Sequence, residues 1–308
     1  MALKQEPHPG ASPAPSAGER VPKVSVIVPH YHDLHGLELC LAALQSQTFP
    51  RDEVEIVVGD NNSPEGEEAV ATAIAGRARL VVIRERGAGP ARNGAAAVAR
   101  GDILAFTDSD CVPEPGWLAE GVAALNKHDF VGGKVRVLVD DMARMTSTEA
   151  FERVFAFDFK DYILNKGFTG SGNLFCARSL FNSVGGFRSV VSEDVEWSHR
   201  ARAMGFTLGY APKAVIGHPA RRTWPELVVK WKKANSEAYN LLIERRGGRL
   251  WWFLRSLALP ASAVVHTPKV LSSPELETIG QRLAALATLY RVRWWRLINA
   301  LQLLAGRS

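Results

Sequence analysis

The hydrophobic pattern between residues 24 and 107 alternates short apolar runs with longer amphipathic segments. Four runs rich in β-branched residues predict buried strands of a parallel sheet: 24–29, 54–59, 80–83 and 103–107. Apolar positions at helical spacing predict helices between them, over 34–47, 64–75 and 90–99. The alternation predicts an α/β fold in which helices cover both faces of a mostly parallel central sheet.

The pattern is less regular from residue 115 to Pro219, where we expect the α/β unit to end. Further helices are predicted over 115–126, 147–157 and 193–204, and short strands over 174–177, 206–210 and 214–216. Residues 159–168 show no clear period, and we interpret them as a mobile loop.

The tail, residues 221–308, predicts helices of a different kind. Apolar residues from Leu227 to Leu241 recur at helical spacing opposite Lys230, Lys232 and Lys233, and this helix is expected to end at Gly247 and Gly248. Residues 250–265 are apolar except for Arg255, but Pro260 interrupts them, which predicts a shallow or buried helix rather than a membrane span. A last apolar stripe over 283–304 has arginines nearby and predicts an interfacial amphipathic helix.

Charge divides the chain at the same place. The tail holds 15 of the 37 Lys and Arg but only 5 of the 32 Asp and Glu, so it carries a net +10 while residues 1–220 carry −5. Six of the eight Trp are also in the tail, and basic residues mixed with Trp suit an anionic membrane surface. No nucleic-acid-binding module is visible. We therefore expect three parts: a disordered leader over 1–22, a catalytic domain over 23–220, and a basic, Trp-rich helical region over 221–308.

Cysteine usage and the N-terminus indicate the compartment. Cys40, Cys111 and Cys176 have neither the number nor the spacing of a disulfide framework or a zinc site. Residues 1–22 lack the apolar core of a signal peptide. We expect a cytoplasmic protein, in peripheral contact with the membrane if the tail binds lipid.

Polar clusters follow three of the predicted strands, at 30–33, 60–62 and 108–110. Ligands of such sheets bind beyond the carboxyl ends of the strands, so these clusters should meet in one crevice. Asp108 and Asp110 lie on one side of an extended tripeptide and could together reach a divalent cation and a ribose or phosphate. The alternative is a solvated turn, because Asp and Ser favour turns.

Motifs in this order resemble a family 2 glycosyltransferase of the GT-A fold, which is Rossmann-like. They are Val24-Ser-Val-Ile-Val-Pro-His-Tyr31, Val58-Gly-Asp-Asn-Asn-Ser63, Ala91-Arg-Asn-Gly94, Phe106-Thr-Asp-Ser-Asp110, Gly170-Ser-Gly-Asn173 and Glu193-Asp194. The resemblance covers about residues 24–218 and leaves the tail uncovered.

The resemblance implies a role for each matching residue. The residues expected to bind the nucleotide are Pro29, Tyr31, Asp60, Arg92, Asn93 and Asp108. The residues expected to bind the metal, Mn²⁺ or Mg²⁺, are Asp110, Asp108 and His218. Asp194 is the expected general base. The sugar or acceptor side is expected to include Gly170, Ser171, Gly172, Asn173, Glu193, Trp197 and Arg200.

Several of these residues have plainer interpretations. Tyr31 could pack as an ordinary aromatic, Asp60 could cap the next helix, and Arg92 could be a surface charge. Acidic residues after Ser192 could simply complement the dipole of a helix, and the segment 170–173 could be an ordinary glycine turn. A single histidine such as His218 is often structural.

We expect an inverting enzyme that moves one sugar from a nucleotide-sugar, in the first instance a UDP-sugar, to a hydroxyl of a saccharide or lipid-linked saccharide. Developing charge on the leaving diphosphate calls for a cation, and the attacking hydroxyl calls for a base. No QxxRW sequence follows Asp194, which argues against a processive polysaccharide synthase. The alternatives are a polyprenyl-phosphate sugar transferase, which needs no base, and a non-catalytic protein that binds sugar nucleotides. The sugar, the acceptor and the oligomeric state cannot be read from the sequence.

Overall fold

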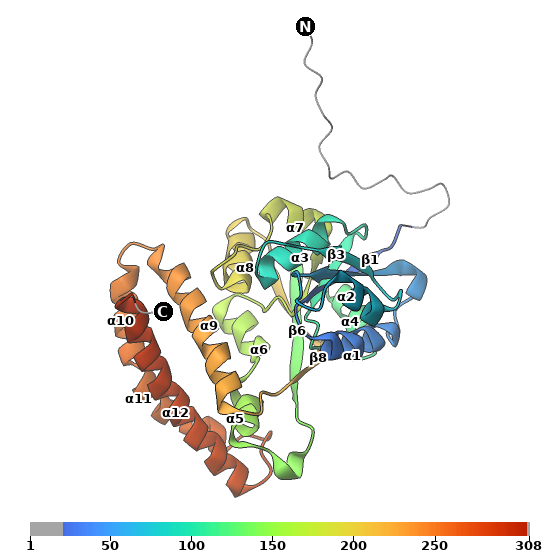
Figure 1. The fold of residues 1–308 in the computed structure, drawn as a ribbon. Coiled ribbons are helices and arrows are strands. Elements are labelled where there is room, and N and C mark those ends of the chain that lie inside the picture. Colours follow the sequence, from blue (N-terminus) through green and yellow to red (C-terminus); the bar gives the residue numbers. More distant parts are fainter. Residues whose placement is uncertain (1–20, 307–308) are drawn as a thin grey trace.

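One mixed eight-stranded sheet forms the centre of the protein, in a computed structural model that describes residues 21–306 (Figure 1). Its order is β3-β2-β1-β4-β7-β6-β8-β5. The leader expected over 1–22 lies outside the described residues except for its last two. The strands are β1 (Val24–His30), β2 (Val54–Asp60), β3 (Arg79–Val82), β4 (Ile103–Thr107), β5 (Val112–Pro113), β6 (Phe130–Leu138), β7 (Asn173–Ala177) and β8 (Leu208–Pro219).

Strands β3, β2, β1 and β4 are parallel, as the alternation predicts. Strand β7 runs antiparallel to both neighbours, while β6 and β8 are parallel to each other. The two short strands predicted over 206–210 and 214–216 are one strand, β8. Its register against β6 shifts between Gly133 and Lys134, opposite Pro212, whose missing N–H interrupts the ladder.

Helices cover both faces of the sheet, and the alternation of side chains along β1 supplies both cores. Val26 and Val28 face the core beneath α1 (Leu34–Gln45) and α4 (Trp117–Ala124). Ile27 faces the opposite core. That second core receives side chains from α3 (Ala88–Ala97), α7 (Arg178–Val184) and α8 (Glu193–Ala203), whereas α2 (Glu67–Ile74) packs near α1.

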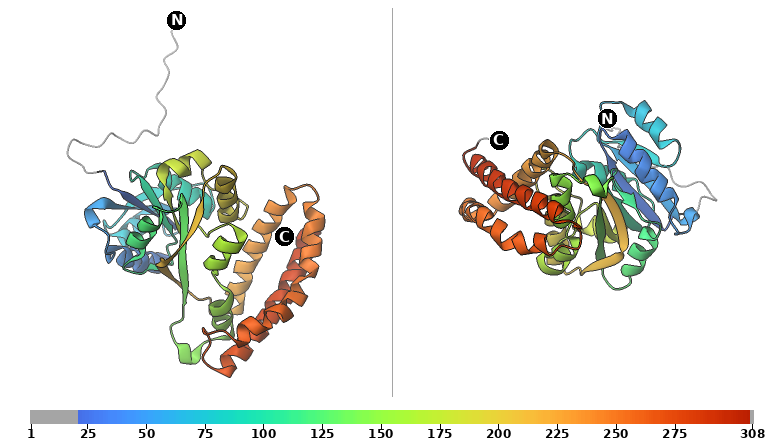
Figure 2. Two further views of the ribbon diagram at one scale, coloured as in Figure 1. Left: turned by 180° about the vertical axis from the view of Figure 1, so that it is seen from behind. Right: turned by 90° about the horizontal axis from the view of Figure 1, so that it is seen from below.

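The C-terminal helices form a separate layer beside the sheet, on the side away from β3 (Figures 1 and 2). They are α9 (Trp224–Ile243), α10 (Gly248–Leu257), α11 (Leu259–Leu271) and α12 (Ile279–Leu304). Helix α5 (Ser147–Phe155) joins them in a third core through Phe151, which packs in one cluster with Leu227 and Leu289. The α/β part and the tail are therefore packed together through α5.

Two expectations need correction. Residues 159–168 are not an irregular loop: Phe159–Asp161 form a helical turn, α6, and Tyr162–Lys166 a π-helical turn. Because a π-turn has a wider spacing than 3.6 residues, the apolar period disappears from the sequence. The shallow or buried helix expected over 250–265 is split at Ala258, and only one face of the two pieces is buried: Trp252 and Ala263 are 3% and 0% exposed, whereas Trp251 and Val265 are 67% and 74% exposed. No helix within residues 21–306 is both long and apolar enough to cross a bilayer.

Candidate active site

The three polar clusters lie at the carboxyl ends of β1, β2 and β4, which are parallel neighbours in the sheet, and the first two clusters are in direct contact. His30 Nδ1 lies 2.8 Å from Asp60 Oδ1, and Asp60 also accepts hydrogen bonds from the Ser63 hydroxyl and, at 3.0 Å, from its N–H. Asp60 therefore holds the turn after β2; it does not cap α2, whose N-cap is Gly66. Asp60 is only 1% exposed, whereas Tyr31 is 60% exposed beside it, and Pro29 is buried in β1.

Arg92 joins two of the motifs. Its guanidinium pairs with Asp108 on one side and Glu193 on the other, and the residue is 4% exposed. The surface-charge interpretation of Arg92 is therefore wrong. Because Arg92 holds one oxygen of Asp108, it fixes the position of that carboxylate at the end of β4.

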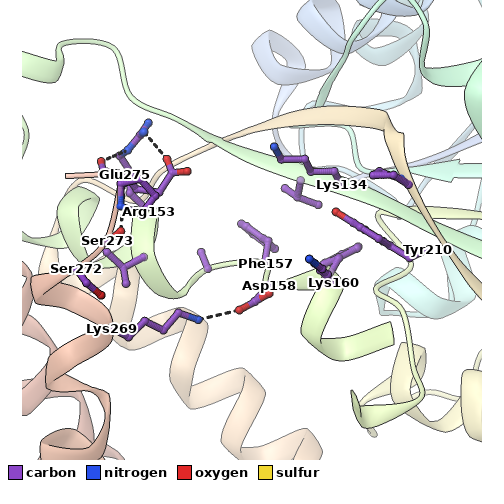
Figure 3. A pocket seen from close by; sticks show the side chains of 16 residues that line it. Lys134, Arg153, Phe157, Asp158, Lys160, Tyr210, Lys269, Ser272, Ser273 and Glu275 are labelled. Carbon is purple, nitrogen blue, oxygen red and sulfur yellow. Dashed lines mark hydrogen bonds and ion pairs between the residues drawn. The ribbon is translucent and has the colours of Figure 1, made fainter. Parts of the chain in front are cut away.

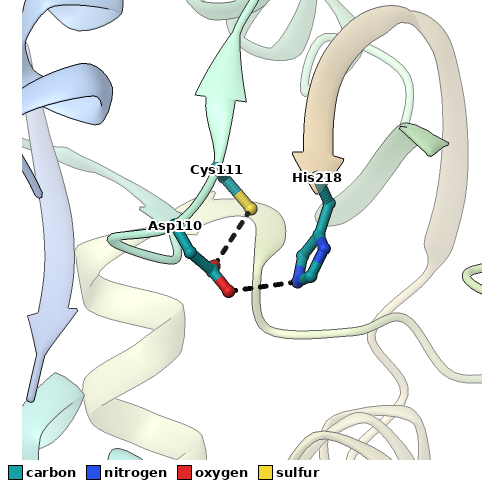
Figure 4. A group of neighbouring side chains, drawn as sticks. All are labelled: Asp110, Cys111 and His218. Atoms are coloured by element: carbon teal, nitrogen blue, oxygen red, sulfur yellow. Dashed lines mark hydrogen bonds and ion pairs between the residues drawn. The ribbon is translucent and has the colours of Figure 1, made fainter. Parts of the chain in front are cut away.

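A second corner of the site contains Asp110, Cys111 and His218, whose ligating atoms all lie within 4.8 Å of one another (Figure 4). His218 Nδ1 donates to the carbonyl of Pro219 at 2.7 Å, which leaves Nε2 directed at Asp110 Oδ2, 3.3 Å away. Burial lowers the pKa of His218, but the hydrogen bond and charge of Asp110 outweigh this and raise it above its ordinary value.

This corner has the donor set for a hard divalent cation. A carboxylate oxygen and an imidazole nitrogen both suit Mn²⁺, and the Asp110 side chain is 39% exposed, so ligand oxygens could reach it. Burial raises the pKa of the Cys111 thiol well above its ordinary value, so its sulfur stays protonated and is a poor ligand for this cation. Asp108 does not belong to the group, since Arg92 engages it instead.

Asp194 lies in the first turn of α8 and borders the same cavity as Asp108 and His218. Burial raises the pKa of Asp194 to about 6, and the charge of Glu193 adds to the effect. Ser192 precedes the helix without a side-chain capping hydrogen bond, but Glu193 and Asp194 do lie in the first turn, where they complement the helix dipole as well as facing the site. A carboxylate of this pKa is ionised at neutral pH and can accept a proton.

The segment 170–173 divides into two parts. A Cβ on Gly172 would lie 2.5 Å from Asp108 Oδ2, and one on Gly170 would overlap the ring of Phe159, so both positions need glycine. Gly170, Ser171 and Gly172 border the cavity. Asn173 does not: it is 0% exposed and hydrogen-bonds the Trp117 indole and two backbone carbonyls.

Three expected site residues act on the backbone around residues 184–187 instead of lining the cavity. Trp197 is 0% exposed and donates to the Gly185 carbonyl, so its expected place on the acceptor side is wrong. The same expectation is wrong for Arg200, because its guanidinium donates to Glu196 and to the carbonyls of Val184 and Gly186. The amide of Asn93 is bonded at both ends to the backbone of Phe187.

The cavity, about 330 Å³, has a wall that sequence reasoning missed. Lys230, Trp231 and Ala234 of α9 border it, together with aromatic side chains of residues 151–168. Lys230 was expected on a solvated helix face, but its ammonium lies 2.6 Å from Glu152, which is fully buried and is also paired with Arg221. The sequence contains one weak signal for this wall: Trp231, next to Lys230, is a large aromatic residue on the apolar side of the predicted helix.

A second cleft of about 580 Å³ adjoins this cavity and shares Phe157 and Phe159 with it (Figure 3). Lys134 and Lys160 point into it, and Lys269 pairs with Asp158 at its edge. Phe157 has a positive φ of 57° and lies against the His218 ring, with centroids 4.4 Å apart. A strained aromatic therefore separates the two spaces.

Comparisons with known proteins agree with this geometry. Residues 25–190 match the family model described as Glycosyl transferase family 2. The glycosyltransferase AglE of Haloferax volcanii is 32% identical over 209 residues, which are 65% of this chain and 68% of AglE. The pre-mycofactocin glycosyltransferase of Mycobacterium tuberculosis is 25% identical over 70% of this chain, which spans 47% of that protein.

A solved structure shows the same fold over almost the whole chain. The mannosyltransferase PcManGT of Pyrobaculum calidifontis, in complex with GDP-Man and Mn²⁺, superposes with a TM-score of 0.60 at 20% identity. The superposition covers 94% of this chain and 89% of that one, so it includes the C-terminal helices.

Proposed function

Because this chain belongs to glycosyltransferase family 2 and has the GT-A fold, we propose that it transfers one sugar from a nucleotide-sugar to an acceptor hydroxyl with inversion. The observation that carries this proposal is a single cavity bordered by Asp108, Asp194 and His218. Donor, cation and base would then act on the same reacting carbon.

On the donor side, Tyr31 would stack on the base, which its exposure supports, and Asp108, held by Arg92, would meet the ribose. Asp110 and His218 would hold Mn²⁺ or Mg²⁺, which stabilises charge on the leaving diphosphate. A UDP-sugar is the first donor to test. A GDP-sugar is the second, because PcManGT was solved in complex with GDP-Man.

On the acceptor side, Asp194 takes the proton of the attacking hydroxyl. As the new bond to the anomeric carbon forms, the bond from that carbon to the diphosphate breaks, and the nucleoside diphosphate leaves with its electron pair. Attack from the face opposite the diphosphate inverts the configuration. Lys230 and Trp231 border the same cavity as Asp194, which supports a role for them in orienting the acceptor.

Thermal stability in the presence of nucleotides tests the donor half of the proposal. A ligand that binds only the folded chain raises the Tm, so we expect a manganese-dependent rise with one of UDP, GDP and CDP. The rise should disappear in an Asp110→Asn variant. A lack of response to all three nucleotides would overturn the donor and metal assignments together.

The Asp194→Asn variant tests the acceptor half. Transfer to a hydroxyl should fall to near zero, because the amide cannot accept the proton. An enzyme that glycosylates a polyprenyl phosphate would keep much of its turnover, since that acceptor is already anionic. A protein that only binds sugar nucleotides would show neither transfer nor donor hydrolysis before the substitution.

The outer face of the C-terminal helices supports the proposal of membrane contact. A stripe of exposed apolar residues runs along α12: Ile279, Leu283, Tyr290, Trp294, Ile298 and Leu301. Helices α10 and α11 add further exposed apolar residues, of which Leu250, Trp251, Val264 and Val265 exceed 60% exposure. Residues 245–306 hold nine Lys or Arg and two acidic residues, so an anionic bilayer is the complementary partner.

Vesicle sedimentation checks this contact. Anionic vesicles should bind the chain in a salt-dependent manner, and Trp251→Glu with Val265→Glu should abolish binding. Met204→Glu is the matched control, because Met204 is 51% exposed at the end of α8. If the double variant binds vesicles as the control does, the apolar face does not contact lipid. The same conclusion holds if the only effect of the substitutions is to separate two copies of the chain that associate through this face.

A further inference from the structure

The cleft of about 580 Å³ beside the cavity has more positive than negative charge on its walls. Four basic and two acidic side chains line it. Both acidic side chains are already neutralised, since Glu275 pairs with Arg153 and Asp158 pairs with Lys269 at 2.8 Å. Two positive charges of the cleft are therefore left without a counter-charge from its own walls.

These two charges are Lys134 of β6 and Lys160 of α6, and both side chains point into the cleft (Figure 3). Within residues 21–306 neither ammonium group makes an ion pair or a hydrogen bond. The hydroxyl of Tyr210, from β8, points into the same space and also has no partner in that part of the chain. Three donors from three elements thus face one space, and the chain uses none of them.

Exposed lysines are common and cost little in water, so the charges alone would not indicate a ligand. The shape and walls of the cleft add the second observation. Its volume lies within the range of about 300–1,000 Å³ that is typical of small-molecule sites, and Phe157, Phe159 and Tyr210 give it aromatic walls. The C–H faces of a sugar ring can pack on such rings while an acidic group of the sugar pairs with the ammonium groups. The cleft therefore fits an acidic sugar unit.

The cleft is continuous with the cavity that contains Asp194. Val135, Ala156, Phe157 and Phe159 border both spaces. The Phe157 ring, at the boundary, belongs to a residue with a positive φ, and such strained residues are frequent at ligand sites. A molecule bound in the cavity can therefore extend past this ring into the cleft.

The position of the cleft in the sheet favours the acceptor over the donor. Its strands are β6 and β8, whereas Tyr31 and Asp60 lie at the ends of β1 and β2. Strands β4 and β7 separate β1 from β6. None of the residues that we assign to the nucleotide or to the cation, all of them within the described chain, borders the cleft.

We propose that the cleft binds an acidic unit of the acceptor, adjacent to the unit whose hydroxyl Asp194 deprotonates. Lys134 and Lys160 pair with a carboxylate or phosphate on this unit, and the aromatic walls pack on its ring. This inference rests on the proposed function. It narrows the acceptor from any saccharide to one that carries an oxyanion next to the site of transfer.

The experiment measures the Tm of the full chain in EDTA, at constant ionic strength, as glucuronate or glucose 6-phosphate replaces chloride. We expect at least one of these anions to stabilise the wild type, and uncharged glucose to stabilise it less. The Lys134→Gln, Lys160→Gln variant should need about tenfold more of that anion for the same rise. The matched control is Lys127→Gln, Lys213→Gln, which removes two charges from exposed positions outside the cleft and should respond as the wild type does.

Equal stabilisation of the wild type and of both double variants would overturn the inference, and so would a wild type that responds to neither anion. A response to glucuronate alone assigns a carboxylate to the acceptor, and a response to glucose 6-phosphate alone assigns a phosphate. A response to both shows that the cleft selects charge and not the kind of oxyanion.

The proposed function is judged separately, by the manganese-dependent response of the wild type to nucleotide. EDTA removes the cation, so binding at the metal corner does not contribute to the anion experiment. A normal nucleotide response together with anion binding that does not depend on Lys134 and Lys160 would refute the acidic subsite alone.

Discussion

The ionisation of Asp194 should control the acid side of the pH profile. A base must be deprotonated to act, so kcat/KM should be constant above the pKa and fall tenfold per pH unit below it. With a pKa of about 6, about one Asp194 in eleven is ionised at pH 5. We therefore expect kcat/KM at pH 5 to be about one-tenth of its value at pH 8.

Glu193 provides the perturbation that tests this cause. After burial, its charge is the second contribution that raises the pKa of Asp194, whereas Arg92 lowers it. Glu193→Gln removes the repulsion and leaves Arg92 paired with Asp108, so the acid limb should move to lower pH. Glu196→Gln, on the same helix and paired with Arg200, is the control and should leave the limb unchanged.

The assay is the release of nucleoside diphosphate over pH 5–8 at subsaturating acceptor, since kcat/KM reports the free enzyme. A profile without an acid limb would refute Asp194 as the base. An acid limb that Glu193→Gln leaves in place would instead refute the electrostatic argument.

Two further substitutions test the packing around the site. Gly172→Ala should lower turnover by on the order of tenfold to a hundredfold while the Tm stays near that of the wild type, because the new Cβ displaces Asp108. Gly116→Ala, whose Cβ would meet one atom at 3.9 Å, is the control. Normal turnover of Gly172→Ala would contradict the argument. Glu152→Gln should lower the free energy of unfolding, measured in urea, by about 3–5 kcal/mol, because it leaves Lys230 and Arg221 without their shared carboxylate. The control, exposed Glu277→Gln, should lower it by about 0.5 kcal/mol at most. A similar value for both variants would show that the ion pairs are unimportant for stability.

The parts of the fold that depend on local pattern were predictable. β-Branched runs and helical spacing predicted the parallel half of the sheet, where each strand is followed by a helix that packs back on it. The antiparallel strand β7 could not be predicted in this way, since its partners β4 and β6 are chosen by distant pairing. The π-turn over Tyr162–Lys166 has no period to detect.

The same division applies to the site. Strand-end position predicted that Asp60, Asp108 and the residues near them would lie at one edge of the sheet, and they do. Strand-end position could not predict which side chains pair with these carboxylates, because the partners are far apart in sequence. Arg92 and Glu193, for example, are separated by 101 residues. Trp197 shares a helix with Asp194, yet the second core, not the cavity, receives it. Helix membership alone does not determine which way a side chain faces.

The proposed site extends beyond the family match. Asp60, Arg92, Asp108 and Asp110 lie within residues 25–190, which match the family model. Asp194, His218, Lys230 and Trp231 lie beyond it, and all four border the same cavity as Asp108. Under the proposed function, the matched region therefore supplies most of the nucleotide side, whereas the base, the histidine of the metal corner and the wall from α9 lie outside it. It follows that the acceptor of a relative aligned only over the first two-thirds of this chain cannot be transferred to it, because such an alignment leaves out the side chains of α9 that border the cavity.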